Sequence, residues 1–293
     1  MIVNSANLNT FFRGIQTRFN TAFRGFTPQW SKVATLVPST TSQEDYGWLG
    51  KWPRLREWIG DRFVQNLTAH EYAIKNKKFE STVAIERDEF EDDKYGVYSP
   101  IFESMGEASA EHPDELVFTL LGAGINTLCY DGQYFFDVDH PVDGASVSNV
   151  DNGGAGEYWF LLDCRKALKP LIFQKRREYA LRSLMNLDDD QVFMTDTFKF
   201  GVDARVNVGF GFWQMAYASN QTLNAANYGA AKAAMIGFED DNGRPLNVRP
   251  SICVVGPSNL SAAEDVFLTQ RLANGADNKY YKQCEVIEVP WLP

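Results

Sequence analysis

Hydrophobic residues near the N-terminus recur with the spacing of a helix. Phe12, Ile15, Phe19, Phe23 and Phe26 follow one another at steps of three or four residues, which places them on one helical face. Residues 1–43 contain no acidic side chain, so the helix is cationic. We favour a helix that packs its aromatic face on protein, either the chain's own core or a neighbouring subunit, over one that lies on a membrane surface.

Between residues 62 and 86, hydrophobic residues recur at every second position, which is the spacing of a strand and not of a helix. Phe79, Val83 and Ile85 alternate with polar side chains, and the pattern predicts strands over 62–67 and 72–85. An isolated two-stranded ribbon is only marginally stable in water. We therefore expect this ribbon to lean on a larger body.

Apolar residues over 98–121 predict a long helix. Ser99 and Pro100 are typical of a helix start, and Gly122 and Gly124 are typical of its end. Pro113 lies inside this segment, where it predicts a kink or a restart of the helix.

The remainder of the chain alternates short apolar runs with two helical segments, over 224–237 and 261–272. The aromatic run over 134–136 predicts a short buried strand. Further strands are expected over 158–164, 171–173, 192–194, 198–201, 206–218, 251–255 and 285–289. Together these elements predict an α+β fold.

Composition narrows the class of protein. The chain has 293 residues, 44% of them hydrophobic and 23% charged, which is typical of a globular protein of one or two domains. No run reaches the roughly 18 apolar residues of a membrane-spanning helix. A formal net charge of −10 argues against a dedicated nucleic-acid binder, which usually has a basic face.

Few residues are suited to catalysis or metal binding. The four cysteines, Cys129, Cys164, Cys253 and Cys284, are far apart in the sequence and are expected to be reduced and mostly buried. Asp137, Asp139 and His140 are the one compact metal or catalytic candidate, but three ligands within four residues seldom converge. The run GFGFWQMA at 209–216 lacks the spacing of a dinucleotide-binding loop.

An acidic cluster follows the predicted ribbon. A cation site would need ligand spacing that this cluster lacks, so we expect a solvated or inter-subunit charged face. The cluster comprises Glu86, Asp88, Glu89, Glu91, Asp92 and Asp93.

Several longer motifs resemble a known family. YGWLGK at 46–51, CYDGQ at 129–133, DVDHP at 137–141 and GFGFWQMA at 209–216 are similar to the major head subunit of Mu-like transposable phages, which has the HK97-like capsid fold. The resemblance extends from about Phe12 to the last predicted strand.

This resemblance implies a division of the chain. It assigns residues 1–45 to an N-terminal arm, 46–97 to an extended β-hairpin (the E-loop) with its flanks, and 98–215 to a peripheral domain whose spine helix is 98–121. Residues 216–293 are assigned to an axial domain. The strand-rich block 158–216 precedes this last range, so the expectation is either a permuted order of the two domains or domains that interleave.

The implied function is structural. The subunit is expected to assemble with itself through arm and E-loop contacts into pentamers and hexamers of an icosahedral head, located in the virion and assembled in the host cytoplasm. Further expected partners are a scaffolding protein, a portal at one vertex, decoration proteins and enclosed double-stranded DNA. No membrane partner, catalytic residue, metal or cofactor is expected. Arg13, Arg18 and Arg24 are expected to meet carboxylates, for which the acidic cluster is a candidate.

Other functions remain as alternatives. An encapsulin-type nanocompartment shares the fold, and it would be recognised by enzyme cargo inside purified shells. A hydrolase would have to use His140, because the chain has only three histidines. A tail-tube subunit is disfavoured by the long predicted helix.

Overall fold

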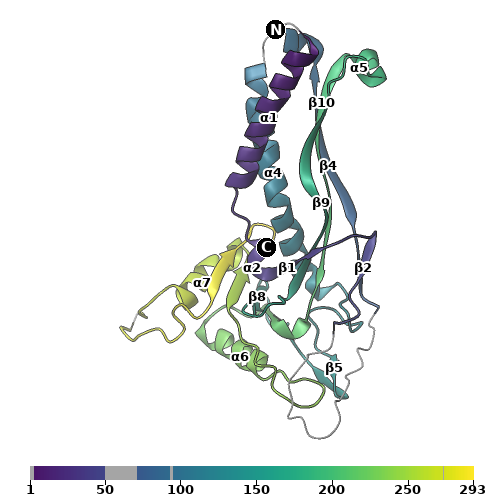
Figure 1. The fold of residues 1–293 in the computed structure, drawn as a ribbon. Helices are drawn as coiled ribbons and strands as arrows, with labels where there is room; N and C mark the ends of the chain where they lie inside the picture. Colours follow the sequence, from purple (N-terminus) through teal and green to yellow (C-terminus); the bar gives the residue numbers. More distant parts are fainter. Residues whose placement is uncertain (1–2, 50–70, 93–94, 273) are drawn as a thin grey trace.

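The computed structural model describes residues 3–49, 71–92, 95–272 and 274–293. A tall column rises from a broader base (Figure 1). The column contains two long helices beside a sheet of long strands, and the base contains a second sheet with two shorter helices.

The sheet of the column has the order β1-β9-β10-β4. Its strands are β1 (Ala34–Pro38), β4 (Lys77–Glu86), β9 (Leu171–Leu184) and β10 (Thr197–Phe210). β9 and β10 form a long antiparallel hairpin, β4 pairs antiparallel with β10, and β1 pairs parallel with β9. Alternate residues of β10, such as Phe198, Phe200 and Val202, are buried beneath the two long helices.

The two long helices are α1 (Ser5–Gly25) and α4 (Tyr95–Gly122). The Asn4 side chain caps α1 by accepting a hydrogen bond from the backbone of Asn7. Leu8, Ile15 and Phe19 are buried in the contact between α1, α4 and the sheet. The aromatic face of the arm therefore packs on the chain's own core.

α4 continues through Pro100 and Pro113 as one long helix, so of the two outcomes considered for Pro113 the restart does not occur. Asp114 accepts hydrogen bonds from the backbone of Gln29 and Trp30 at 2.9 and 2.6 Å. These bonds fix the chain where it leaves α1 and enters the short helix α2 (Trp30–Val33).

The base is built on a sheet of order β13-β12-β8-β11-β7. Its strands are β7 (Val150–Asp151), β8 (Trp159–Leu162), β11 (Ala216–Ser219), β12 (Ile252–Val255) and β13 (Glu285–Glu288). Helices α6 (Ala225–Ile236) and α7 (Leu260–Phe267) pack on this sheet. All residues of β8, β11 and β12 are buried, so this sheet is the core of the base.

Smaller elements complete the described chain. They are α3 (Arg87–Glu91), α5 (Asp190–Thr195), β2 (Gln43–Asp45), β3 (Ala73–Lys75), β5 (His140–Val142), β6 (Ala145–Val147), and the 3-10 turns Ala123–Ile125, Trp213–Met215 and Pro257–Asn259. No helix of the described ranges is both long enough and apolar enough to cross a bilayer.

Four predicted elements are wrong. Residues 192–194 lie in α5 at the tip of the β9–β10 hairpin, because Asp189 caps a short helix there and Asp196 ends it in the left-handed conformation. The strand expected over 206–218 is divided by a 3-10 turn between β10 and β11. The run at 134–136 forms only an isolated bridge between Tyr134 and Leu128. The last helix ends at Phe267, whereas the sequence pattern predicts that it continues to residue 272.

The predicted ribbon is described only in part. Its first strand, over 62–67, lies outside the described residues. Its second strand divides at Asn76, whose side chain donates to Ser39 Oγ and to the Thr41 carbonyl oxygen. β4 then runs as an edge strand of the column sheet, so this part of the ribbon does lean on a larger body.

Candidate functional site

His140 is completely buried beneath the ring of Trp213. The two rings are nearly parallel, with centroids 4.0 Å apart. His140 Nδ1 lies 2.7 Å from Asp131 Oδ2, and Nε2 lies 3.2 Å from Asn149 Oδ1. Asn149 Nδ2 donates to backbone carbonyls, including that of Phe135, so its oxygen faces the histidine and Nε2 is the donor.

The candidate cluster of Asp137, Asp139 and His140, which the sequence did not favour, does not come together as one hydrogen-bonded group. The Asp137 carboxylate accepts from the backbone N–H groups of Tyr134 and Val138. Asp139 is exposed, and partial desolvation together with the charge of Asp137 raises its pKa. Neither side chain is a hydrogen-bond partner of His140. The residue that pairs with His140 is Asp131, which the sequence indicated only as part of an Asp-Gly turn.

Cys129, Asp131 and His140 do converge. Their potential ligand atoms lie within 4.8 Å of one another. Cys129 Sγ donates to Asp131 Oδ1 at 3.0 Å, and burial together with the Asp131 charge raises the pKa of the thiol. Burial alone would raise the pKa of Asp131, but the hydrogen bonds from His140 and Cys129 outweigh it and lower that pKa. Cys129 is therefore a protonated thiol in a hydrogen-bonded core network and is poorly suited to nucleophilic attack.

The second described histidine has a similar structural setting. His112 lies half-buried between Phe79 and Tyr179, and its Nδ1 is 2.6 Å from the Tyr179 hydroxyl. Burial lowers the pKa of His112. It borders a cavity of about 270 Å³ between α4 and the column sheet. His70 lies outside the described residues.

The cysteines are free thiols, as predicted. Cys129, Cys253 and Cys284 are buried and Cys164 is half-buried. Burial raises the pKa of each of these four thiols.

The aromatic arm makes its contacts within the chain. Phe12 stacks on Phe200 of β10 with ring centroids 6.5 Å apart, and Phe23 contacts Tyr179 of β9 at 6.0 Å. Arg18 forms an ion pair of 2.8 Å with Glu103 of α4. The carboxylate that Arg18 meets therefore belongs to α4 of the same chain and not to the acidic cluster.

The described part of the acidic cluster, Glu86 to Asp92, lies where β4 reaches the far end of the column, and Asp93 lies outside the described residues. Arg87 of α3 pairs with Glu91 at 3.0 Å and lies 3.8 Å from Asp196, which closes the β9–β10 hairpin. This geometry joins α3 and α5 in one acidic end of the molecule.

Comparison with known proteins decides between a structural and an enzymatic function. The sequence model of the family described as Mu-like prophage major head subunit gpT matches residues 8–292. The chain belongs to this family.

Relatives and a solved structure agree with this assignment. The chain is 45% identical over 267 residues to the Mu-like prophage FluMu major head subunit of Haemophilus influenzae, covering 87% of each protein. It is 42% identical over 285 residues to the major capsid protein of Escherichia phage Mu, covering 94% of this chain and 93% of that protein. The procapsid of bacteriophage JBD30 superposes with a TM-score of 0.87 and 44% identity, over 99% of this chain and 100% of that one.

This Mu-like head subunit is a structural protein of the phage capsid with an HK97-like α+β fold. It builds a shell from many copies of itself and resides in the virion. Its relatives are capsid proteins, so the enzyme alternative based on His140 and the encapsulin alternative are not favoured.

Proposed function

We propose that the column is the peripheral domain of the head subunit and that the base is the axial domain, which faces the centre of a ring of five or six subunits. The observation that carries this proposal is the division into two sheets with separate helices. α4 is then the spine helix of the peripheral domain. The axial domain takes residues 216–293 together with β7 and β8, because these two strands lie in the base sheet.

The arm and the E-loop keep their proposed ranges, 1–45 and 46–97. β4 anchors one side of the E-loop range to the column, since it pairs with β10 along its whole length. We place the rest of the E-loop against a neighbouring subunit, where it adds to the contacts that close the shell.

The proposed shell is an icosahedral head of pentamers and hexamers that encloses double-stranded DNA. A scaffolding protein and a portal at one vertex are proposed partners during assembly. Decoration is supported by a further similar structure, the JBD30 capsid decorated with minor capsid protein trimers, which has a TM-score of 0.78 and 35% identity over 92% of this chain. The acidic balance of the chain suits a container that does not grip its DNA tightly.

Electron microscopy of labelled rings tests the domain assignment. Two variants each carry one added exposed cysteine for labelling. Asn242→Cys places it in an exposed turn of the base, and Gln16→Cys places it on the exposed face of α1. The chain is expressed with the neighbouring head genes, labelled with maleimide gold and averaged as capsomers. We expect gold near the ring centre for Asn242→Cys and away from it for Gln16→Cys. The reverse pattern would overturn the assignment, and a chain that stays monomeric with its scaffold would overturn the capsomer proposal.

A further inference from the structure

Three cations face one another across the sheet of the column. Arg205 of β10 lies directly opposite Lys78 of β4 on one side and opposite Arg177 of β9 on the other. The β9–β10 pairing is irregular on both sides of Arg205, but the ion pair between Arg177 and Asp203, two residues before Arg205 on β10, places Arg177 on the same face. Like charges directly opposite one another on paired strands repel. We call Lys78, Arg177 and Arg205 the cation row.

Carboxylates within the chain neutralise only part of this face. Asp203 forms an ion pair with Arg177, and its carboxylate lies 3.4 Å from Arg182. Within the described residues, no ion pair reaches Lys78 or Arg205, and Arg205 Nε is buried without a hydrogen-bond partner. Arg205 Nε is covered within the subunit, so a carboxylate from outside the chain would reach the row through the exposed Lys78 ammonium and the remaining guanidinium nitrogens of Arg205.

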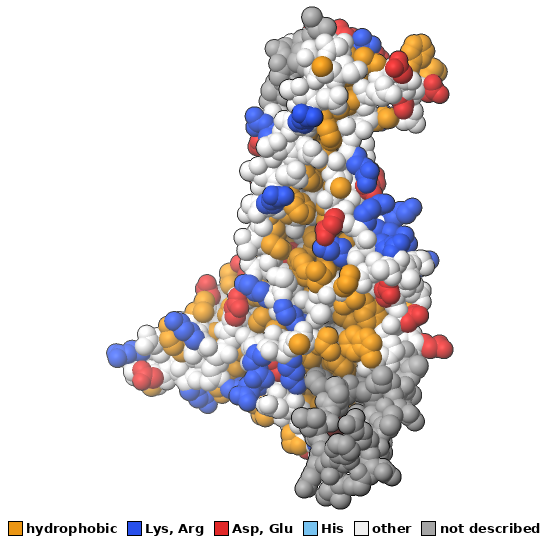
Figure 2. Space-filling model, in the orientation of Figure 1, with side chains coloured by type: hydrophobic (Ala, Val, Ile, Leu, Met, Phe, Trp, Pro, Cys, Tyr) orange, Lys and Arg blue, Asp and Glu red, His pale blue; other side chains and the backbone are white. Residues whose placement is uncertain are grey.

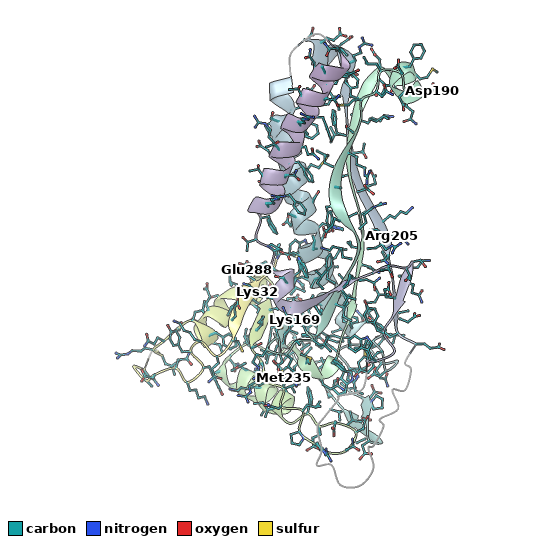
Figure 3. All side chains as sticks on the ribbon, in the orientation of Figure 1. Lys32, Lys169, Asp190, Arg205, Met235 and Glu288 are labelled. Atoms are coloured by element: carbon teal, nitrogen blue, oxygen red, sulfur yellow. The ribbon has the colours of Figure 1, made fainter. Side chains whose placement is uncertain are left out.

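The cation row belongs to a larger basic surface on the flank of the column. Lysine and arginine side chains gather there in the space-filling view (Figure 2), and Arg205 lies on the side of the hairpin turned away from α1 and α4 (Figure 3). Neighbouring cations are Lys75 at the end of β3, Lys77 on β4, and Lys175, Arg176 and Arg182 on β9. Of these, Lys175 forms an ion pair with Glu178.

The end of the β9–β10 hairpin, at α5, is acidic and exposes large hydrophobic side chains. Phe193 and Met194 on α5 are 80% and 78% exposed, the highest fractions among the large hydrophobic side chains of the described ranges. Asp188 and Asp190 beside them are also exposed. We call Asp188, Asp190, Phe193 and Met194 the acidic tip. An exposed aromatic side chain beside charged residues is typical of an interface anchor.

We propose that the acidic tip of one subunit docks on the cation row of a neighbouring copy in the shell. The Asp188 and Asp190 carboxylates accept hydrogen bonds from Lys78 and Arg205 of the neighbour. Phe193 packs on the aliphatic stems and the guanidinium groups of the row. The proposal rests on assembly of the chain with itself, and it adds the surfaces through which one contact is made.

Charge complementarity favours this partner over two others. Contact between two acidic tips would bring carboxylates of the same sign together. Packaged DNA could supply anionic phosphates to the row, but it would leave the exposed Phe193 and Met194 uncovered. The tip and the row are also different surfaces of one molecule, so each subunit can give one contact and receive another, as a shell of heterologous contacts requires.

Reciprocal charge reversal tests the contact. The row variant carries Lys78→Glu and Arg205→Glu, and the tip variant carries Asp188→Lys and Asp190→Lys. Each is expected to lower the yield of sedimenting shells by about tenfold or more, because like charges then face each other at the contact. The combined variant is expected to recover most of that yield. A combined variant that yields no more sedimenting shells than the row variant or the tip variant alone would overturn the proposal.

A matched control separates the contact from a change in net charge. Asp241→Lys with Glu264→Lys makes the same charge change as the tip variant, but at exposed positions of the base. We expect this control to keep its shells. Because Arg205 is partly buried, Lys78→Gln with Arg205→Gln provides a milder row variant, and thermal melting of the unassembled subunit identifies any variant that fails to fold.

Disulfide trapping gives a second readout that does not depend on yield. Chains carrying Phe193→Cys are coexpressed with chains carrying Lys78→Cys, and the shells are oxidised. We expect disulfide-linked dimers only when both variants are present. Dimers from Phe193→Cys alone would indicate contact between tips and would overturn the proposal. If the row variant forms normal shells that contain less DNA, the cation row binds DNA and the proposal is overturned. If the unaltered chain forms no shells, the proposed assembly itself is contradicted.

Discussion

At the residue scale, the buried histidine stabilises the fold. Asn149 donates to backbone carbonyls of Phe135, Trp213 and Ala216 and accepts from His140, which in turn pairs with Asp131. The network therefore ties the segment after α4 to the start of the base sheet. This explains how a chain without a catalytic function can have a buried acid beside a histidine and a thiol.

Replacing Asp131 tests this role. We expect Asp131→Asn to lower the free energy of unfolding by about 1.5–3 kcal/mol at neutral pH, because the hydrogen bonds from His140 and Cys129 lose their charged acceptor. The pKa of Asp131 is lowered by folding, so its contribution is complete above the ordinary carboxyl pKa of 3.8 and is lost as the pH falls below it. Denaturant unfolding of both proteins between pH 7 and pH 3 should show the gap narrowing in acid.

Asp139→Asn is the matched control. Asp139 is exposed, so removing its charge is expected to leave the free energy of unfolding almost unchanged at neutral pH. Equal losses for the two variants would contradict the assigned role of Asp131.

At the element scale, the arm is held by a close approach of two helices. A Cβ atom at Gly106 of α4 would lie 2.5 Å from the carbonyl oxygen of Phe19 on α1. Only glycine at this position lets the two backbones come so near. The contact explains why the aromatic face of the arm is satisfied within the chain.

Two glycine substitutions with opposite expected signs test this contact. Gly106→Ala should destabilise the protein by about 1–3 kcal/mol, because the helices must move apart. Gly14→Ala on α1 should stabilise it by about 0.5–1 kcal/mol, since nothing lies within 4 Å of the added Cβ and alanine favours the helix. Midpoints of thermal unfolding measure both changes, and a neutral Gly106→Ala would argue that the arm is loosely held.

Local sequence patterns predicted an element well where one of its faces is buried over several helical turns or several strand residues. α1, α6 and β4 fall close to their predicted ranges for this reason. α5 was missed because three apolar residues fit a strand as well as a helix. A side-chain cap and a left-handed residue decide its conformation instead.

At the scale of the whole molecule, the base sheet takes strands from both sides of position 215. β8 lies between β11 and β12, which come from the last part of the chain. A domain boundary between residues 215 and 216 would therefore separate β7 and β8 from the other strands of the base sheet.

Truncation tests whether the column and base are separable. A chain of residues 1–215 lacks β11 and β12, so the buried side chains of β8, including Trp159 and Phe160, lose both neighbouring strands. We expect this fragment to be insoluble or to unfold without a cooperative transition by circular dichroism. A soluble fragment with a sharp transition would show that the column folds without the base.

The sequence by itself determined the family and those elements whose hydrophobic pattern repeats over several turns. The aromatic stripe at residues 12–26 and the long motifs specify an arm helix and a Mu-like head subunit, because periodicity and motif order are written along the chain. Only the tertiary structure decided which distant residues meet. Asp131 became the partner of His140, and Lys78, Arg177 and Arg205 became neighbours through the register of three strands. A period of two reports which face of a strand is buried, but it carries no information on which strand will lie beside it.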